Sequence, residues 1–234
     1  MEDKKIQIGM LIFPKMTQLD FTGPFEALAR LPNAQVHVVW KTKDPVTSDT
    51  GLSFLPTTTL AECPPLDVIC VPGGPGQIEL MDDQEVIGFV RTMGGKAKYV
   101  TSVCTGALVL GAAGLLDGYE AATHWMSAEQ LPLFGAKPVA RRFVVDRNRI
   151  TGGGVTAGID FGLYLASQLG GEEAARRIQL FLEYDPAPPF DSGSPRTAAA
   201  PLVQGVRDWG AKMIERRWAA SRRAAERLKQ TPAL

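Results

Sequence analysis

The sequence contains few of the residues that bind metals or form disulfides. Among its 234 residues are three cysteines and two histidines. The cysteines at positions 63, 70 and 104 form neither a Cys-x-x-Cys pair nor an even set, and His37 and His124 do not complete a zinc-ligand spacing. We therefore expect reduced thiols, no metal and no organic cofactor.

An excess of charge of one sign is also absent. Lysine plus arginine and aspartate plus glutamate both number 25, so the formal net charge is zero. Such a balance does not favour nucleic acid, an anionic membrane or a polyanionic substrate. We expect a small, weakly charged ligand, with neither nucleic acid nor a membrane as partner.

Long hydrophobic runs are missing as well. No stretch approaches the ~20 apolar residues that a spanning helix needs. The opening "MEDKKIQIGMLIF" has a short apolar stretch before Pro14 and no small-residue cleavage site, which indicates a first strand and not a signal peptide. These features predict a cytoplasmic protein.

Strand and helix patterns alternate along most of the chain. Apolar, β-rich runs predict strands at 5–13, 34–41, 66–74 and 99–103, a side hairpin near 51–59 and a second hairpin at 141–154 with its turn at 146–148. A first helix is predicted to start near Thr22 or Gly23, ahead of Pro24. A second helix is predicted in the segment 82–97, where Gly94 and Gly95 would end it. Further helices are predicted at 105–116, in part of 122–135, at 156–170 and at 171–184. This alternation predicts one α/β domain over 1–234, with a mostly parallel sheet between layers of helices.

The C-terminal part differs in composition. A segment rich in proline, glycine and serine at 185–199 leads into an arginine-rich helical pattern. Such a basic helix could bind nucleic acid. The helix also carries a possible apolar stripe, formed by Leu202, Val206, Trp209, Met213 and Trp218. This stripe favours a helix docked on the domain, with a solvated basic face.

Cys104 lies where a strand meets a helix, in "SVCTG". This order is typical of a nucleophile elbow, in which a tight turn lifts a reactive side chain clear of the sheet and Gly106 relieves crowding. A helix N-terminus beneath it is expected to lower the thiol pKa. The alternative is a buried, unreactive cysteine, as we expect of Cys63 and Cys70.

Two other predicted strand ends meet the same edge of the sheet. The glycine amides of "VPGG" at 71–74 could form an oxyanion hole with the amide of Thr105. The carboxylate of Asp20 follows the first strand, although it could instead cap the next helix.

Four segments carry a family resemblance: "QLDFTGPFEAL", "DVICVPGGPG", "YVTSVCTGALVLGAAGLLDGYEAATHW" and "TGGGVTAGIDFGL". In order and spacing they resemble the ThiJ/PfpI superfamily, which has the flavodoxin-like fold of class I glutamine amidotransferases. The resemblance spans most of residues 5–190. Within the superfamily, "LDFTGP", "SVCTG", "ATHW" and "LEYDPAPPFDSGSP" are most similar to bacterial isocyanide hydratases.

The resemblance implies roles for individual residues. Cys104 would be the nucleophile, Asp20 its acidic partner, and the amides of Gly74 and Thr105 the anion-stabilising donors. Peptidase-like and amidotransferase-like relatives have a histidine where this chain has Thr105, and the deglycase branch has a glutamate where it has Asp20. His124 would lie near the site or serve as a hydrogen-bonded structural residue.

The resemblance also implies an activity and an assembly. A thiolate and a carboxylic acid flanking a small apolar pocket could hydrate an isocyanide to an N-substituted formamide through a cysteine thioimidate, in a homodimeric enzyme. Glyoxalase or deglycase activity and redox sensing through thiol oxidation stay open. A ligand-sensing module is a further alternative, since similar domains precede AraC-type DNA-binding regions. We expect no such region here, because the sequence ends at Leu234 without one.

Overall fold

The computed structural model describes residues 5–230, which fold around a seven-stranded sheet. The strand order is β10-β11-β7-β6-β1-β2-β5, and every neighbouring pair is parallel except β10 with β11. The strands are β1 (Ile6–Leu11), β2 (Ala34–Trp40), β5 (Thr58–Thr59), β6 (Val68–Val71), β7 (Tyr99–Ser102), β10 (Phe143–Asp146) and β11 (Arg149–Gly152). This sheet confirms the predicted α/β class and its flavodoxin-like, mostly parallel arrangement.

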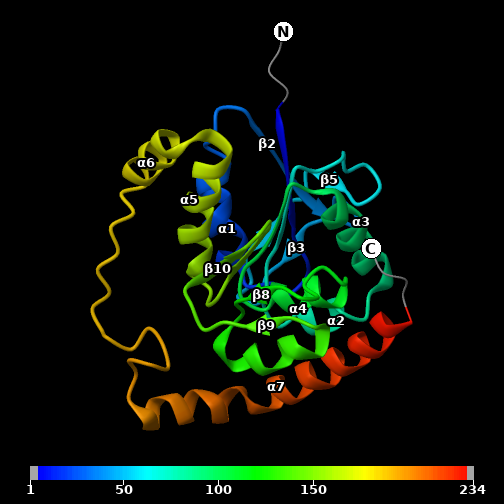
Figure 1. The fold of residues 1–234 in the computed structure, drawn as a ribbon, viewed down its shortest axis with the longest axis vertical. Coiled ribbons are helices and arrows are strands. Elements are labelled where there is room, and N and C mark those ends of the chain that lie inside the picture. Colours follow the sequence, from blue (N-terminus) through cyan, green and yellow to red (C-terminus); the bar gives the residue numbers. More distant parts are fainter. Residues whose placement is uncertain (1–4, 231–234) are drawn as a thin grey trace.

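Helices cover both faces of the sheet (Figure 1). One layer contains α1 (Gln18–Leu28), α5 (Ala157–Gly170) and α6 (Glu172–Phe181), which pack on one another. The other contains α2 (Gln77–Leu80), α3 (Gln84–Lys96) and α4 (Gly106–Ala112). Because both faces are covered, all four residues of β6 are buried, as expected of a central parallel strand.

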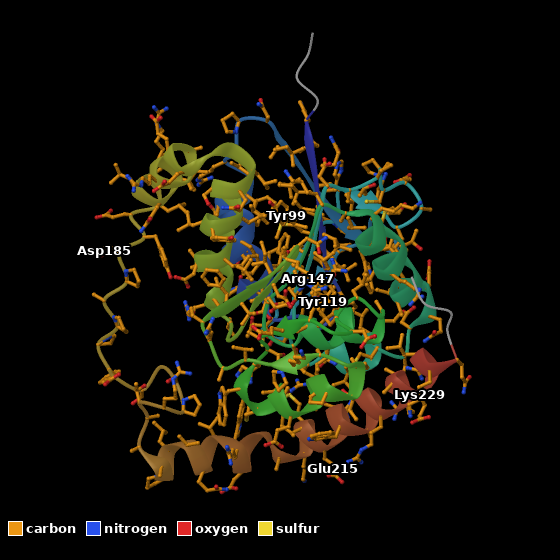
Figure 2. The ribbon with its side chains drawn as sticks, in the orientation of Figure 1. Tyr99, Tyr119, Arg147, Asp185, Glu215 and Lys229 are labelled. Carbon is orange, nitrogen blue, oxygen red and sulfur yellow. The ribbon has the colours of Figure 1, made fainter. Side chains whose placement is uncertain are left out.

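Smaller elements complete the domain. They are the hairpin of β3 (Val46–Thr47) with β4 (Ser53–Phe54), the pair β8 (Glu120–Ala121) with β9 (Lys137–Pro138), and the 3₁₀ helix η1 (Trp125–Phe134). The turn between β10 and β11 lies at Arg147 and Asn148, within the predicted turn. The Arg147 guanidinium stacks 3.4 Å from the centre of the Tyr119 ring (Figure 2), which fixes this turn against the body.

Two helix boundaries differ from the sequence predictions. α1 begins at Gln18 and contains Pro24, whereas we expected Pro24 to mark the helix start. A Cβ on Gly158 of α5 would lie 2.7 Å from Cδ of Pro24, so this glycine lets the two helices approach at the proline. α3 continues through Gly94 to Lys96, whereas we expected Gly94 and Gly95 to end it. Gly94 serves packing instead, since a Cβ there would lie 2.5 Å from Cδ1 of Leu115.

The C-terminal helix α7 (Ala200–Lys229) packs on η1, α2 and α4, and the segment before it runs outside the helical layers (Figure 1). The predicted apolar stripe is wrong in its first half, since Leu202 and Trp209 are 50% and 83% exposed. The buried residues of α7 are instead Gly210, Arg217, Ala220, Ser221, Ala224 and Ala225. Small residues allow close packing of the second half. No helix in residues 5–230 is long and apolar enough to cross a membrane.

Candidate active site

Cys104 occupies a strained turn directly after β7. Its φ angle is 53°, in the left-handed region that L side chains rarely adopt, as a nucleophile elbow requires. Its N–H donates to the Gly152 carbonyl at 3.1 Å, and its carbonyl accepts from Thr123 Oγ1 at 2.8 Å. A Cβ on Gly106 would lie 2.1 Å from the Val71 carbonyl oxygen, so only glycine fits after the turn. The predicted elbow geometry is confirmed.

Asp20 reaches the same point from the first turn of α1. Thr17 occupies the N-cap position, and Asp20 Oδ2 instead accepts the Gly73 N–H at 2.9 Å. The Asp20 carboxyl also lies close enough to the Cys104 thiol for each group to shift the pKa of the other. Its Oδ1 has no hydrogen-bond partner among the described residues. Asp20 is completely buried, so this carboxyl faces the thiol and not the helix end.

Burial sets the protonation of this pair. Desolvation raises the pKa of Asp20 to about 7, despite the hydrogen bonds from Gly73 and Cys104 that favour the carboxylate. The pKa of Cys104 is also raised, by burial and by the charge of Asp20. The backbone N–H of Thr105 and the charge of Arg217 both favour the thiolate, but neither outweighs this rise.

The expected lowering of the Cys104 pKa is therefore wrong. A helix N-terminus favours the thiolate, but burial and a neighbouring carboxylate disfavour it more strongly here. Two such groups titrate as a pair, and near neutral pH the pair holds one proton between the sulfur and the carboxyl. That single proton is what an acid and a nucleophile working together require.

The loop after β6 forms the third side of the site, next to Cys104 and Asp20. A Cβ on Gly73 would lie 2.5 Å from the Thr105 nitrogen and 3.0 Å from Asp20 Oδ2, so its absence lets these groups converge. The Gly74 N–H donates to Thr105 Oγ1 at 3.1 Å. This bond occupies the amide that we expected to stabilise an anion. In this geometry the Gly74 N–H holds Thr105, and of the two expected amides only that of Thr105 lowers the pKa of Cys104.

His124 follows Thr123 and lines a cavity of about 500 Å³ on the carboxyl side of the sheet. No described residue hydrogen-bonds to its ring, so it is not a hydrogen-bonded structural histidine within residues 5–230. Burial and the charge of Arg217 lower the pKa of His124 to about 4. The imidazole is therefore neutral at pH 7.

Arg217 is a site neighbour that the sequence does not reveal. Its guanidinium is 2% exposed and donates through Nε to Gln77 Oε1 at 2.8 Å and through Nη1 to Ser127 Oγ at 3.1 Å. Both partners are neutral, and among the described residues it forms no ion pair with a carboxylate. Its positive charge acts on Cys104 and on His124. Burying a charge without a counter-ion costs free energy, so Arg217 keeps this position against a desolvation penalty.

The other two cysteines have inert surroundings. Burial raises the pKa of Cys70 to about 12 and that of Cys63 to about 11. Neither has an acidic partner in hydrogen-bond contact. Residues 5–230 also contain no group of three or more His, Cys, Asp or Glu side chains that could hold a metal ion.

Comparison with known proteins places this arrangement in a family. The sequence matches the model of the DJ-1/PfpI family over residues 6–168. A Pseudomonas putida protein named isonitrile hydratase is 56% identical over 223 residues, which are 95% of this chain and 98% of that protein. A crystal structure of a ThiJ/PfpI family protein from Pseudomonas syringae has a TM-score of 0.91 at 45% identity, covering 93% of this chain and 90% of that one.

A regulator matches more distantly. The HTH-type transcriptional regulator GbdR of Pseudomonas aeruginosa is 29% identical over 187 residues, which are 76% of this chain and 50% of the regulator. By contrast, the similarity to the Pseudomonas putida protein extends over nearly the whole length of both chains.

Proposed function

The chain belongs to the DJ-1/PfpI family, and from that premise we propose that it hydrates isocyanides to N-substituted formamides with Cys104 as nucleophile. The observation that carries the proposal is the position of the Cys104 thiol close to a buried Asp20 whose pKa is raised to about 7. The full-length similarity to an isonitrile hydratase supports the same reaction. An enzyme that catalyses this hydration is a hydro-lyase, and the proposed reaction needs no cofactor.

The first step forms a carbon–sulfur bond. The terminal carbon of an isocyanide accepts a nucleophile and a proton at the same atom, so both must come from one side of the pocket. In the singly protonated pair the thiol holds the proton, because the pKa of Cys104 is raised above that of Asp20, and the proton moves to Asp20 as the sulfur attacks. Asp20 then gives that proton to the same carbon, leaving a neutral thioimidate on Cys104 and a carboxylate on Asp20. Acid–base help of this kind contributes ~10²–10⁴-fold.

The second step consumes water. The Asp20 carboxylate takes a proton from water as the oxygen attacks the thioimidate carbon, passes it to the nitrogen, and accepts the hydroxyl proton as the adduct collapses. Collapse of the resulting tetrahedral adduct breaks the carbon–sulfur bond and releases the formamide. The sulfur leaves as thiolate and the pair again holds one proton. The sum is one isocyanide plus one water giving one N-substituted formamide.

Four further residues contribute to these steps. The Thr105 amide, which favours the ionised sulfur, stabilises the thiolate before attack and on departure. The bond from Gly74 to the Thr105 hydroxyl keeps that amide in place. The charge of Arg217 favours the singly ionised pair. Neutral His124 lines the cavity that the substrate would enter.

The residue after the nucleophile argues against a hydrolytic triad. Thr105 stands where a histidine would act as base, and the neutral ring of His124 makes no hydrogen bond with a described residue. Peptide or glutamine hydrolysis would need such a base next to the thiol. The Asp20 carboxyl, in contrast, suits proton delivery to carbon.

The test is product formation. Purified protein incubated with phenyl isocyanide should yield N-phenylformamide, and methylglyoxal in a parallel reaction should be consumed much more slowly. No formamide, or faster consumption of methylglyoxal, would count against isocyanide hydration and favour the glyoxalase alternative. A homodimer in the cytoplasm remains part of the proposal on family resemblance.

A further inference from the structure

The cavity beside Cys104 carries positive charge at its open side. Four arginines line it: Arg141, Arg142, Arg196 and Arg207. All four are exposed, and none of the lining residues is an aspartate or glutamate. The chain as a whole has no net charge. The local excess of positive charge is therefore a property of this cavity and not of the whole surface.

Only one of these charges is neutralised by a described carboxylate. Arg142 pairs with Asp160 at 2.6 Å. Arg196 donates through Nη1 to the Ala140 carbonyl at 3.0 Å, a neutral partner. The two others make no ion pair with a carboxylate in residues 5–230, although the Arg207 guanidinium lies 5.6 Å from the centre of the Trp125 ring.

Two other residues that line the cavity adjoin the backbone of the elbow. Thr123 is a buried lining residue, and its hydroxyl holds the Cys104 carbonyl at 2.8 Å. Gly153, another buried lining residue, directly follows the Gly152 carbonyl that accepts the Cys104 N–H. One cavity thus joins the backbone around the nucleophile to three arginines without a carboxylate partner.

We propose that the substrate is an isocyanide that also carries a carboxylate, with the isocyano carbon toward Cys104 and the carboxylate among Arg141, Arg196 and Arg207. The inference rests on the proposed hydration at Cys104 and adds the chemical class of the remaining part of the substrate. Guanidinium groups bind carboxylates through charge-assisted, often bidentate hydrogen bonds. A cavity of about 500 Å³ suits a single small molecule and not a polymer.

The test uses a matched pair of substrates, 6-isocyanohexanoate and its neutral primary amide. The alkyl chain insulates the isocyano group, so the two differ in charge and not in intrinsic reactivity. At low ionic strength kcat/KM should be at least ~10-fold higher for the carboxylate, and the ratio should fall as sodium chloride screens the exposed arginines. Arg141→Gln and Arg207→Gln should each lower the ratio toward one.

Arg176→Gln is the matched control. Arg176 is an exposed arginine paired with Glu172 on α6 and does not line the cavity, so its replacement should leave the ratio unchanged. This inference is overturned if the enzyme turns over phenyl isocyanide and the amide, but the ratio of kcat/KM for the carboxylate to kcat/KM for the amide is at or below one. That result leaves the hydratase proposal standing. A high ratio that the cavity variants do not lower overturns the assignment to these arginines. Absence of turnover for every isocyanide contradicts the proposed function itself.

Discussion

The carboxyl of Asp20 lies close to the thiol of Cys104, and both groups are buried at the carboxyl edge of the sheet. Asp20 comes from the first turn of α1 and Cys104 from the turn after β7, so the parallel sheet brings together two distant parts of the chain. The carboxylate raises the cost of ionising the thiol, whereas the thiol favours the carboxylate. Together they form a pair that shares a proton instead of a preformed thiolate.

Asp20→Asn should abolish most of the activity. The amide can still accept the Gly73 N–H, so the local fold is kept, but it cannot deliver a proton to the isocyanide carbon. We expect kcat/KM for phenyl isocyanide to fall by ~10²-fold or more. Asp20→Glu, which keeps the acid on a longer side chain, should retain more activity than the amide. Equal activity of wild type and Asp20→Asn would remove Asp20 from the mechanism.

The pH profile should report the pair and not a single group. Below pH 7 both groups hold protons, so no nucleophile is present; above pH 7 the pair holds one proton, which is the reactive form. The value of kcat/KM should therefore rise through about pH 7 and stay high until the second proton is lost, above the usual pKa of a cysteine. A profile that falls as the pH rises through 7 would contradict this assignment of protons.

The buried carboxyl should also make stability depend on pH. The folded-state pKa of Asp20 is about 7 against an ordinary value of 3.8, so the folded protein binds the extra proton between these values. Its contribution to stability is present at low pH and is lost as the pH rises through about 7. Three pKa units correspond to ~4 kcal/mol at most.

Asp20→Asn should therefore unfold at a higher temperature than wild type at pH 8, with a smaller difference at pH 5. Thermal unfolding at the two pH values measures this change. Asp208→Asn, an exposed aspartate on α7, is the control and should show no such pH-dependent gain. If Asp20→Asn gives the same difference at both pH values, Asp20 is already ionised in the folded protein at low pH.

Arg217→Met should move the acid limb of the kcat/KM profile to higher pH. Without the guanidinium, the singly ionised pair loses a favourable charge, and a shift of one pH unit would lower kcat/KM ~5-fold at pH 7. Arg217→Lys keeps the charge and should restore part of the limb position. Loss of activity in both variants without a shift in the limb would give Arg217 a purely structural role.

Arg216→Met provides the matched comparison for this variant. Arg216 is the preceding residue on α7 but is exposed and pairs with Glu79 at 2.6 Å. Removing an exposed ion pair of this kind has little effect on stability. The acid limb should stay in place in Arg216→Met, which separates loss of charge at the site from loss of an arginine on the helix.

The sequence was sufficient to predict those parts of the site that depend on backbone order. Strand, "SVCTG" and helix predicted the elbow at Cys104, and Gly106 proved to be the residue that permits close approach to Val71. Asp20 could be placed at the correct edge because the ends of parallel strands meet there. The sequence does not decide whether the Asp20 carboxylate caps the helix or faces the thiol, since both are ordinary positions for an aspartate.

Other features could not be predicted because they depend on tertiary burial. The Cys104 pKa was expected to fall from the helix end alone, but the depth of the pair and the Asp20 charge reverse the direction. Arg217 has the same residue type as its exposed neighbour Arg216, and only packing distinguishes them. The sequence does not show that the Gly74 N–H donates to the Thr105 hydroxyl oxygen, and we therefore expected this N–H to stabilise an anion.

Capture of the covalent intermediate tests the central claim most directly. The protein is mixed with phenyl isocyanide, quenched rapidly and digested, and the peptides are examined by mass spectrometry while formamide is measured in parallel. We predict a mass increase of one isocyanide on the peptide containing Cys104, with no adduct there and no formamide from Cys104→Ala. The control Cys63→Ala should keep both signals. Undiminished formamide production by Cys104→Ala would contradict the account.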